Sequence, residues 1–83
     1  MTTTIEISFY PLNNDYPISV VNFLQKLRAI PDIEMETNGM STLIIGNYEK
    51  LWPRLGAMMQ EKLVDDNCIF VLKIAPGRRE YVD

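Results

Sequence analysis

Hydroxyl, carboxylate and aromatic side chains in three short segments have the chemistry to bind a small, flat ring that is polar or cationic. The first segment alternates between apolar and polar residues, and the other two flank an Asn-Gly dipeptide. A ring can stack on an aromatic face, while hydroxyls and carboxylates meet its polar edge. The candidate ligand-binding residues are Ser8, Tyr10, Glu36, Ser41 and Thr42.

The residues that usually carry catalysis are missing from the sequence. The chain has no histidine, no Cys-x-x-Cys pair, no glycine-rich phosphate loop and no metal-ligand cluster of recognisable spacing. Ser41 or Ser8 would need a base to become a nucleophile, and only carboxylates and Lys73 are on offer. The single cysteine, Cys68, fits a small buried hydrophobe at a strand start. We therefore expect no enzyme, no catalytic residue, no metal and no cofactor.

Size and charge restrict the classes of protein and partner that remain. The 83 residues are 47% apolar and 23% charged, which is typical of one globular domain. The net charge is -3, and the one basic pair, Arg78-Arg79, has acidic neighbours, so a nucleic-acid partner is not expected. The N-terminus Met1–Thr4 lacks the features of a signal peptide, and no apolar run reaches the ~20 residues of a membrane span. A cytoplasmic protein with no membrane partner is the expectation.

Periodicity predicts six elements that would position the candidate residues. Alternation indicates strands, a three-to-four-residue apolar spacing indicates helices, and proline and glycine mark their ends. The predicted strands are Thr3–Tyr10, Ile33–Thr37, Met40–Gly46 and Cys68–Ala75. The predicted helices are Ile18–Ile30, which follows Pro17, and a segment that begins at the N-cap Asn47 and ends before the loop Asp65–Asn67. Pro53 is expected to delay the true start of this second helix.

Asn38-Gly39 is a strong hairpin signal, since a type I′ turn needs positive φ at both central residues. A two-residue loop would pair Thr37 with Met40, Glu36 with Ser41, Met35 with Thr42 and Glu34 with Leu43. That register puts Ser41 and Thr42 on opposite faces of the sheet. Of the two hydroxyls, Ser41 is the one expected to reach the open face.

The order β-α-β-β-α-β with right-handed connections predicts an α+β, ferredoxin-like sandwich: a four-stranded antiparallel sheet with both helices on one face. The first and third strands should be central and the other two should be edges. Residues 1–83 form a single domain, in which 77–83 are a polar tail that either frays or crosses to a partner.

The sheet face that no helix covers mixes polar and apolar residues. By alternation it carries Glu6, Ser8, Tyr10, Glu34, Glu36, Ser41, Leu43, Ile45, Val71 and Lys73. An ordinary solvated face is one interpretation. Its apolar members also fit dimerisation in so small a chain, with a pocket at the interface.

Three segments carry a family resemblance: Ile5–Leu12, the helix from Ile18 to Leu27, and Met40-Ser41-Thr42 leading to Gly46. Over roughly Ile5 to Ile74 the chain resembles the YkoF-like thiamin/hydroxymethylpyrimidine-binding family. The resemblance implies the ferredoxin-like fold and binding of thiamin or its pyrimidine moiety without catalysis, for uptake or trafficking. The namesake proteins carry two such repeats in one chain, whereas this chain has one, so a homodimer or higher oligomer is the expected equivalent.

On that resemblance, Tyr10 would stack on the ring, Ser41 and Thr42 would hydrogen-bond its polar edge, and Glu36 would accept from the exocyclic amine. Ser8 lies beside them on the open face. The alternative is a protein-interaction or self-association module with no small ligand. A third interpretation is a small cofactor-free enzyme on a dimeric scaffold, with Tyr10 or Glu36 as acid or base.

Overall fold

The computed structural model describes residues 1–65 and 67–80, and it confirms the predicted element order. Its elements are β1 (Thr2–Pro11), α1 (Tyr16–Arg28), β2 (Glu34–Thr37), β3 (Thr42–Asn47), α2 (Tyr48–Asp65) and β4 (Cys68–Pro76). Asp66 of the expected loop and residues 81–83 of the expected tail lie outside the described residues. Among the helices described, none has the length and apolar character needed to cross a membrane.

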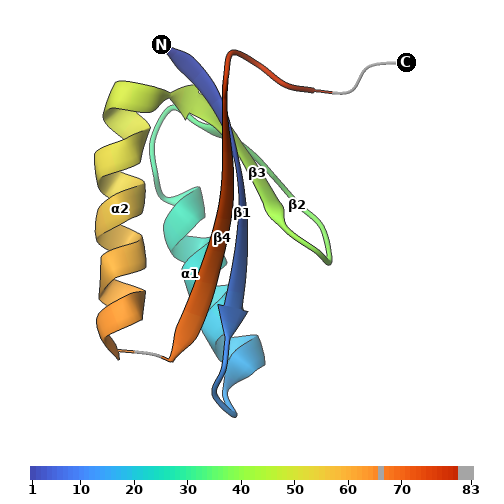
Figure 1. The fold of residues 1–83 in the computed structure, drawn as a ribbon, viewed down its shortest axis with the longest axis vertical. Coiled ribbons are helices and arrows are strands. Elements are labelled where there is room, and N and C mark those ends of the chain that lie inside the picture. Colours follow the sequence, from blue (N-terminus) through green and yellow to red (C-terminus); the bar gives the residue numbers. More distant parts are fainter. Residues whose placement is uncertain (66, 81–83) are drawn as a thin grey trace.

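The four strands form one antiparallel sheet in the order β2-β3-β1-β4, and both helices cover the same face (Figure 1). β1 and β3 are central and β2 and β4 are edges, as predicted. This is the α+β, ferredoxin-like sandwich expected from the sequence. β1 pairs with β4 from Thr3 to Pro11, but it pairs with β3 only from Thr2 to Ile7.

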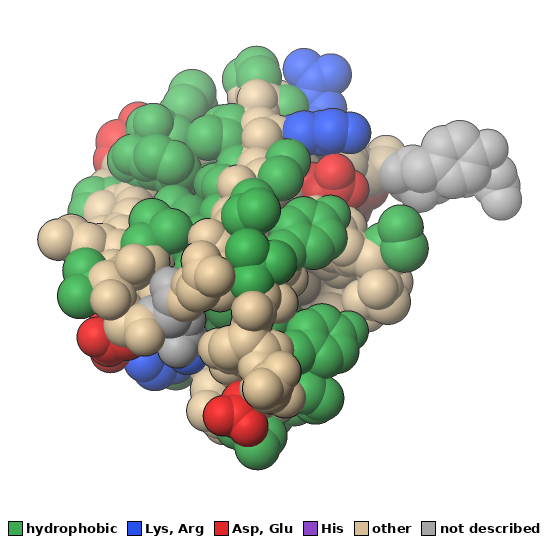
Figure 2. Space-filling model, turned by 60° about the horizontal axis from the view of Figure 1, so that its bottom comes forward, with side chains coloured by type: hydrophobic (Ala, Val, Ile, Leu, Met, Phe, Trp, Pro, Cys, Tyr) green, Lys and Arg blue, Asp and Glu red, His purple; other side chains and the backbone are tan. Residues whose placement is uncertain are grey.

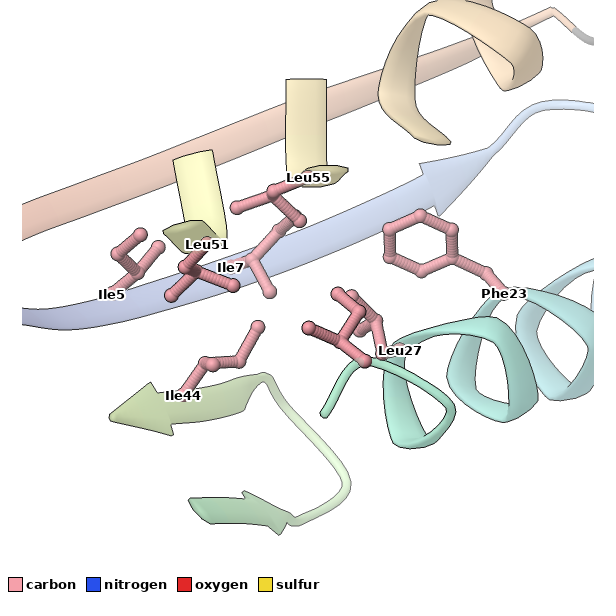
Figure 3. Close-up of a cluster of buried hydrophobic side chains, with 8 residues drawn as sticks. Ile5, Ile7, Phe23, Leu27, Ile44, Leu51 and Leu55 are labelled. Atoms are coloured by element: carbon pink, nitrogen blue, oxygen red, sulfur yellow. The ribbon is translucent and has the colours of Figure 1, made fainter. Parts of the chain in front are cut away.

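The core lies between the sheet and the helices, where side chains of β1, β3 and both helices converge (Figure 3). The alternation of β1 sends Ile5 and Ile7 into this core, as predicted. α1 contributes Leu27 and also Phe23, which is 2% exposed. The fully or nearly buried apolar side chains are Ile5, Ile7, Phe23, Leu27, Ile30, Ile44, Leu51 and Leu55.

The predicted two-residue turn is wrong. Residues 38–41 form a four-residue loop, and neither Asn38 nor Gly39 has the positive φ of a type I′ turn. The observed pairs are Thr37 with Thr42, Glu36 with Leu43, Met35 with Ile44 and Glu34 with Ile45. The Asn38 side chain explains the longer loop, because its Oδ1 accepts hydrogen bonds from the backbone N–H groups of Met40 (2.7 Å) and Ser41 (3.0 Å).

The register error leaves the predicted faces intact. Thr37 pairs with Thr42 rather than Met40, a shift of two residues, and an even shift returns each side chain to the same face. Thr42 is buried on the helix-covered side, and its hydroxyl and that of Thr37 share a 3.0 Å hydrogen bond. Ser41 and Thr42 therefore look in opposite directions, as the alternation predicted.

Local signals place the helix starts with one correction. Pro17 lies in the first turn of α1, where its missing N–H leaves no intrahelical bond unmade. Asn47 caps α2, since its Oδ1 accepts from the N–H of Lys50 at 3.1 Å. Pro53 does not delay α2, which begins at Tyr48 and continues through the proline. Pro53 is the sixth residue of the helix, so the hydrogen bond that it cannot donate is one near the start of the helix.

At the end of β4 the described part of the tail turns away from the helices (Figure 1), and it contacts the open face of its own chain near the start of β1. The Thr4 hydroxyl donates to the Gly77 carbonyl at 2.8 Å and accepts from the N–H of Arg79 at 2.9 Å. The Arg78 guanidinium is paired with the carboxylate of Glu34 on β2. The tail thereby buries Thr4 and its cross-strand neighbour Ile45, so that end of the open face is covered.

Candidate ligand-binding site

A cleft of about 160 Å³ lies between α1, the end of β1 and the loop 38–41. We call it the hairpin cleft. It exists because β3 begins at Thr42, which pairs with Ile7, whereas β1 continues to Pro11. Beyond Ile7, β1 has a neighbour only on its β4 side. Its lining residues are Ile7, Phe9, Tyr10, Tyr16, Val20, Phe23, Leu24, Thr37, Asn38, Gly39, Met40, Ser41 and Thr42.

Aromatic rings form the floor and part of the rim. The rings of Phe9 and Phe23 meet with centroids 4.9 Å apart, and Phe70 of β4 completes a three-ring cluster behind them. Phe23 is held in the core, so this floor is rigid. Tyr10 and Tyr16, 48% and 57% exposed, stand at the rim. Such a surface suits a flat ring.

The polar groups of the cleft come from the hairpin and are tied to β1. The Ser41 hydroxyl donates to Glu6 Oε2 at 3.3 Å, and Glu6 Oε1 lies 3.7 Å from Lys73 Nζ on β4. The Glu6 carboxylate leaves the Ser41 oxygen able to accept from a ligand N–H. Thr42 is engaged with Thr37 instead, through the hydroxyl pair on the core side. One hydroxyl is thus oriented by a carboxylate and the other by its neighbour in the hairpin.

The structure brings together three of the five candidate residues. Tyr10, Ser41 and Thr42 line the hairpin cleft, and the cleft reaches both faces of the sheet because β3 begins only at Thr42. Ser8 lies on the open face opposite Val71 and is not part of the lining. Glu36 also lies on the open face, where it lines a separate hollow of about 150 Å³ with Glu34 and Glu80.

Several residues that shape this cleft were not among the predicted site residues, including Phe9 and Phe23 of its floor. Glu6 was placed on the open face but not linked to Ser41, which is 35 positions away in the chain. Tyr16 and Met40 were not singled out, and Asn38 was assigned only to the turn. The Asn-Gly signal marked the right place, and the Asn38 carboxamide that orders the loop gives it its shape.

Part of the open face is apolar and accessible. Ile69 and Val71, each 51% exposed, follow Tyr10 along the β1–β4 pair. Seen from the end of the molecule that carries the β1–α1 connection, hydrophobic side chains make up much of the surface, with charged ones mostly at its margin (Figure 2).

Within the described residues, no three His, Cys, Asp or Glu side chains come together as a cation site.

Comparison with known proteins identifies the fold. No family model and no curated protein matches the sequence. Among solved structures, a Thermotoga maritima protein provisionally described as a thiamine biosynthesis/salvage protein shares 14% identity and a TM-score of 0.78, over 89% of this chain and 82% of that one. A protein from Streptococcus pneumoniae shares 20% identity and a TM-score of 0.80, over 94% and 89%. A domain of unknown function, DUF77, from Bacillus cereus shares 17% identity and a TM-score of 0.74, over 100% and 83%.

The fold of this chain matches that of each of these structures over most of the length of both chains. At such identities the likeness defines the fold class, a single ferredoxin-like repeat, and leaves the ligand to be argued from the side chains.

Proposed function

We propose that this protein binds thiamin or its hydroxymethylpyrimidine moiety in the hairpin cleft without catalysing a reaction. The observation that carries the proposal is the combination of a rigid aromatic floor with a hydroxyl, Ser41, that a carboxylate orients at the rim. The resemblance of Ile5–Leu12 and of Met40-Ser41-Thr42 to the thiamin-binding family supports it, as does the shared fold of the provisionally described thiamine protein.

The size of the cleft favours the ring over the whole vitamin. Its 160 Å³ is below the ~300–1,000 Å³ of pockets that enclose a complete small ligand. The pyrimidine would lie on Phe9 and beside Tyr10, and its amino group would donate to Ser41 or to Glu6 behind it. The rest of thiamin would extend past Tyr10 toward solvent or a second copy of the chain. In this arrangement Glu6 takes the acceptor role that the sequence assigned to Glu36.

Calorimetry with thiamin and with hydroxymethylpyrimidine tests the proposal. We expect both to bind, and we expect Tyr10→Phe to retain the affinity that Tyr10→Leu loses, since stacking needs the ring and not its hydroxyl. The ligands should be recovered unchanged after incubation. Absence of binding heat at millimolar ligand would contradict the proposal that the protein binds thiamin. Measurable turnover would contradict the proposal that it is not an enzyme.

A second candidate function is self-association through the open face, with or without a ligand. It is favoured by the exposed row formed by Tyr10 of β1 and by Ile69 and Val71 of the edge strand β4. A homodimer formed there would place a second chain next to the rim of the hairpin cleft. Light scattering with Val71→Glu as the disrupting variant and Val64→Glu, on the far surface of α2, as the control measures this. A wild-type protein that is monomeric at high concentration argues against it.

A further inference from the structure

We propose a second binding site, for a small organic anion, in a cavity at the start of α2. The cavity measures about 290 Å³ and is lined by Ile30, Pro31, Asp32, Ile33, Asn47, Lys50, Leu51 and Arg54. It shares no residue with the hairpin cleft and lies at the opposite end of β3. The site stands whether or not the hairpin cleft binds thiamin.

The loop between α1 and β2 packs tightly against the end of β3 beside this cavity. Ile33 Cγ2 lies 3.0 Å, and the Asp32 carbonyl oxygen 3.6 Å, from where a Cβ on Gly46 would be. A side chain at position 46 would crowd Ile33, so the glycine at the end of β3 lets the loop pack this closely. Asp32 itself has φ +61°, the left-handed region that non-glycine residues rarely adopt. The loop thereby forms the wall of the cavity that lies opposite α2.

Two cations face that wall from consecutive turns of α2. Lys50 and Arg54 are four residues apart, so their side chains rise from the same side of the helix. Within the described residues the side chain of neither makes an ion pair or a hydrogen bond, whereas the side chains of Lys26, Lys73 and Arg78 are all paired with carboxylates. In a chain of net charge -3, two unpaired cations on one cavity are a local excess of positive charge.

The other residues that line the cavity indicate what the uncharged part of the ligand would be. Leu51 and Ile30 are buried beneath the cavity, and Ile33 and Pro31 give it an apolar side. Asp32 supplies one carboxylate that could accept from a ligand hydroxyl or amine. The chemistry fits a carboxylate or phosphate monoester on a small apolar body, with its anionic group between Lys50 and Arg54. The positive end of the α2 dipole adds to the attraction.

Amide chemical-shift titration of the full chain with phenyl phosphate, benzoate, inorganic phosphate and neutral benzamide tests the site. We expect the first two to shift the amides of Ile33, Gly46 and Leu51 but not those of Gly39 to Thr42, with dissociation constants on the order of 1 mM. The stronger of the two identifies the preferred anionic group. Inorganic phosphate should bind more weakly than phenyl phosphate, because it lacks the apolar body.

The double variant Lys50→Gln/Arg54→Gln should weaken binding about tenfold or more. Lys26→Gln/Lys73→Gln removes the same net charge away from the cavity and should leave it unchanged. Both pairs are exposed, so both variants should fold. The proposal fails if no probe shifts these amides at about 10 mM, if benzamide binds as well as benzoate, or if the two double variants behave alike. Thiamin binding in the hairpin cleft should survive in Lys50→Gln/Arg54→Gln, because neither residue lines that cleft, and this separates the anion site from the proposed function.

Discussion

The hydroxyl of Ser41 donates a hydrogen bond of 3.3 Å to the carboxylate of Glu6, joining the hairpin loop to the central strand β1. Ser41 is the last residue of the loop that Asn38 orders, and it immediately precedes Thr42, which pairs with Ile7 of β1. The contact fixes the direction of the hydroxyl at the rim of the hairpin cleft. It gives the cleft an oriented acceptor for a ring amine, and it leads to the first prediction.

Ser41→Ala and Thr42→Val should separate ligand binding from stability. Ser41→Ala removes the hydroxyl at the rim, so we expect hydroxymethylpyrimidine to bind about fivefold more weakly, for the loss of roughly 1 kcal/mol, with little change in unfolding. Thr42→Val removes the buried partner of Thr37 and should lower the free energy of unfolding by about 1 kcal/mol instead. Calorimetry and urea denaturation measure the two effects; equal effects on both quantities would contradict the assignment.

Gly39→Ala and Gly77→Ala should have different effects on stability. Gly39 has no positive φ, and no atom lies within 4 Å of where its Cβ would be, so alanine there should be neutral or slightly stabilising. Gly77 has φ +76° where the chain leaves β4, and alanine there should cost roughly 1 kcal/mol. Thermal denaturation of the two variants checks this. A large loss from Gly39→Ala would instead favour the two-residue type I′ turn.

Phe23→Ala should be among the most damaging single changes. Phe23 is nearly fully buried and contacts the rings of both Phe9 and Phe70, so its loss leaves a cavity in the core and in the cleft floor. We expect a cost of about 3–5 kcal/mol, which is a large share of the stability of a small domain. Val21→Ala, on the exposed side of the same helix, is the matched control and should cost less than about 1 kcal/mol in urea denaturation.

The tail should be held less firmly against the sheet at acid pH, because its ion pair with Glu34 is lost when that carboxylate is protonated. The hydrogen bond from Arg78 lowers the pKa of Glu34 below its usual value, more than desolvation raises it. A carboxyl whose folded pKa is lowered stabilises the folded form above its unfolded pKa and loses that contribution as pH falls through the folded one. The Arg79 amide should therefore exchange faster as pH drops below roughly 4.3, after correction for intrinsic exchange.

Glu34→Gln should remove that pH dependence and leave the tail equally exposed to exchange at neutral and acid pH. Glu49, whose pKa is lowered by the hydrogen bond from the N-terminal amine, provides the control. Glu49→Gln should leave the exchange of Arg79 unchanged. An Arg79 amide whose protection is independent of both substitutions would show that the bond to the Thr4 hydroxyl alone holds the tail.

Much of the fold could be predicted because the signals are local. Alternation in Ile5, Ile7 and Phe9, the proline in the first turn of α1 and the Asn47 cap each act over a few residues. The element order then left few right-handed topologies. The register of the hairpin could not be predicted, because Asn38 can serve either a tight turn or a longer loop. In the structure the longer loop occurs together with the pairing of β3 with β1.

The sequence by itself therefore determined the four strands, the two helices, the side of the sheet that they cover and the opposite directions of Ser41 and Thr42. Only the tertiary structure decided which of these residues meet. It joined Ser41 to Glu6, moved Glu36 away from the candidate site and brought Asp32 against Gly46. The reason is physical: alternation and capping depend on neighbours within a turn or a strand, whereas a cleft depends on where strands of unequal length end beside one another.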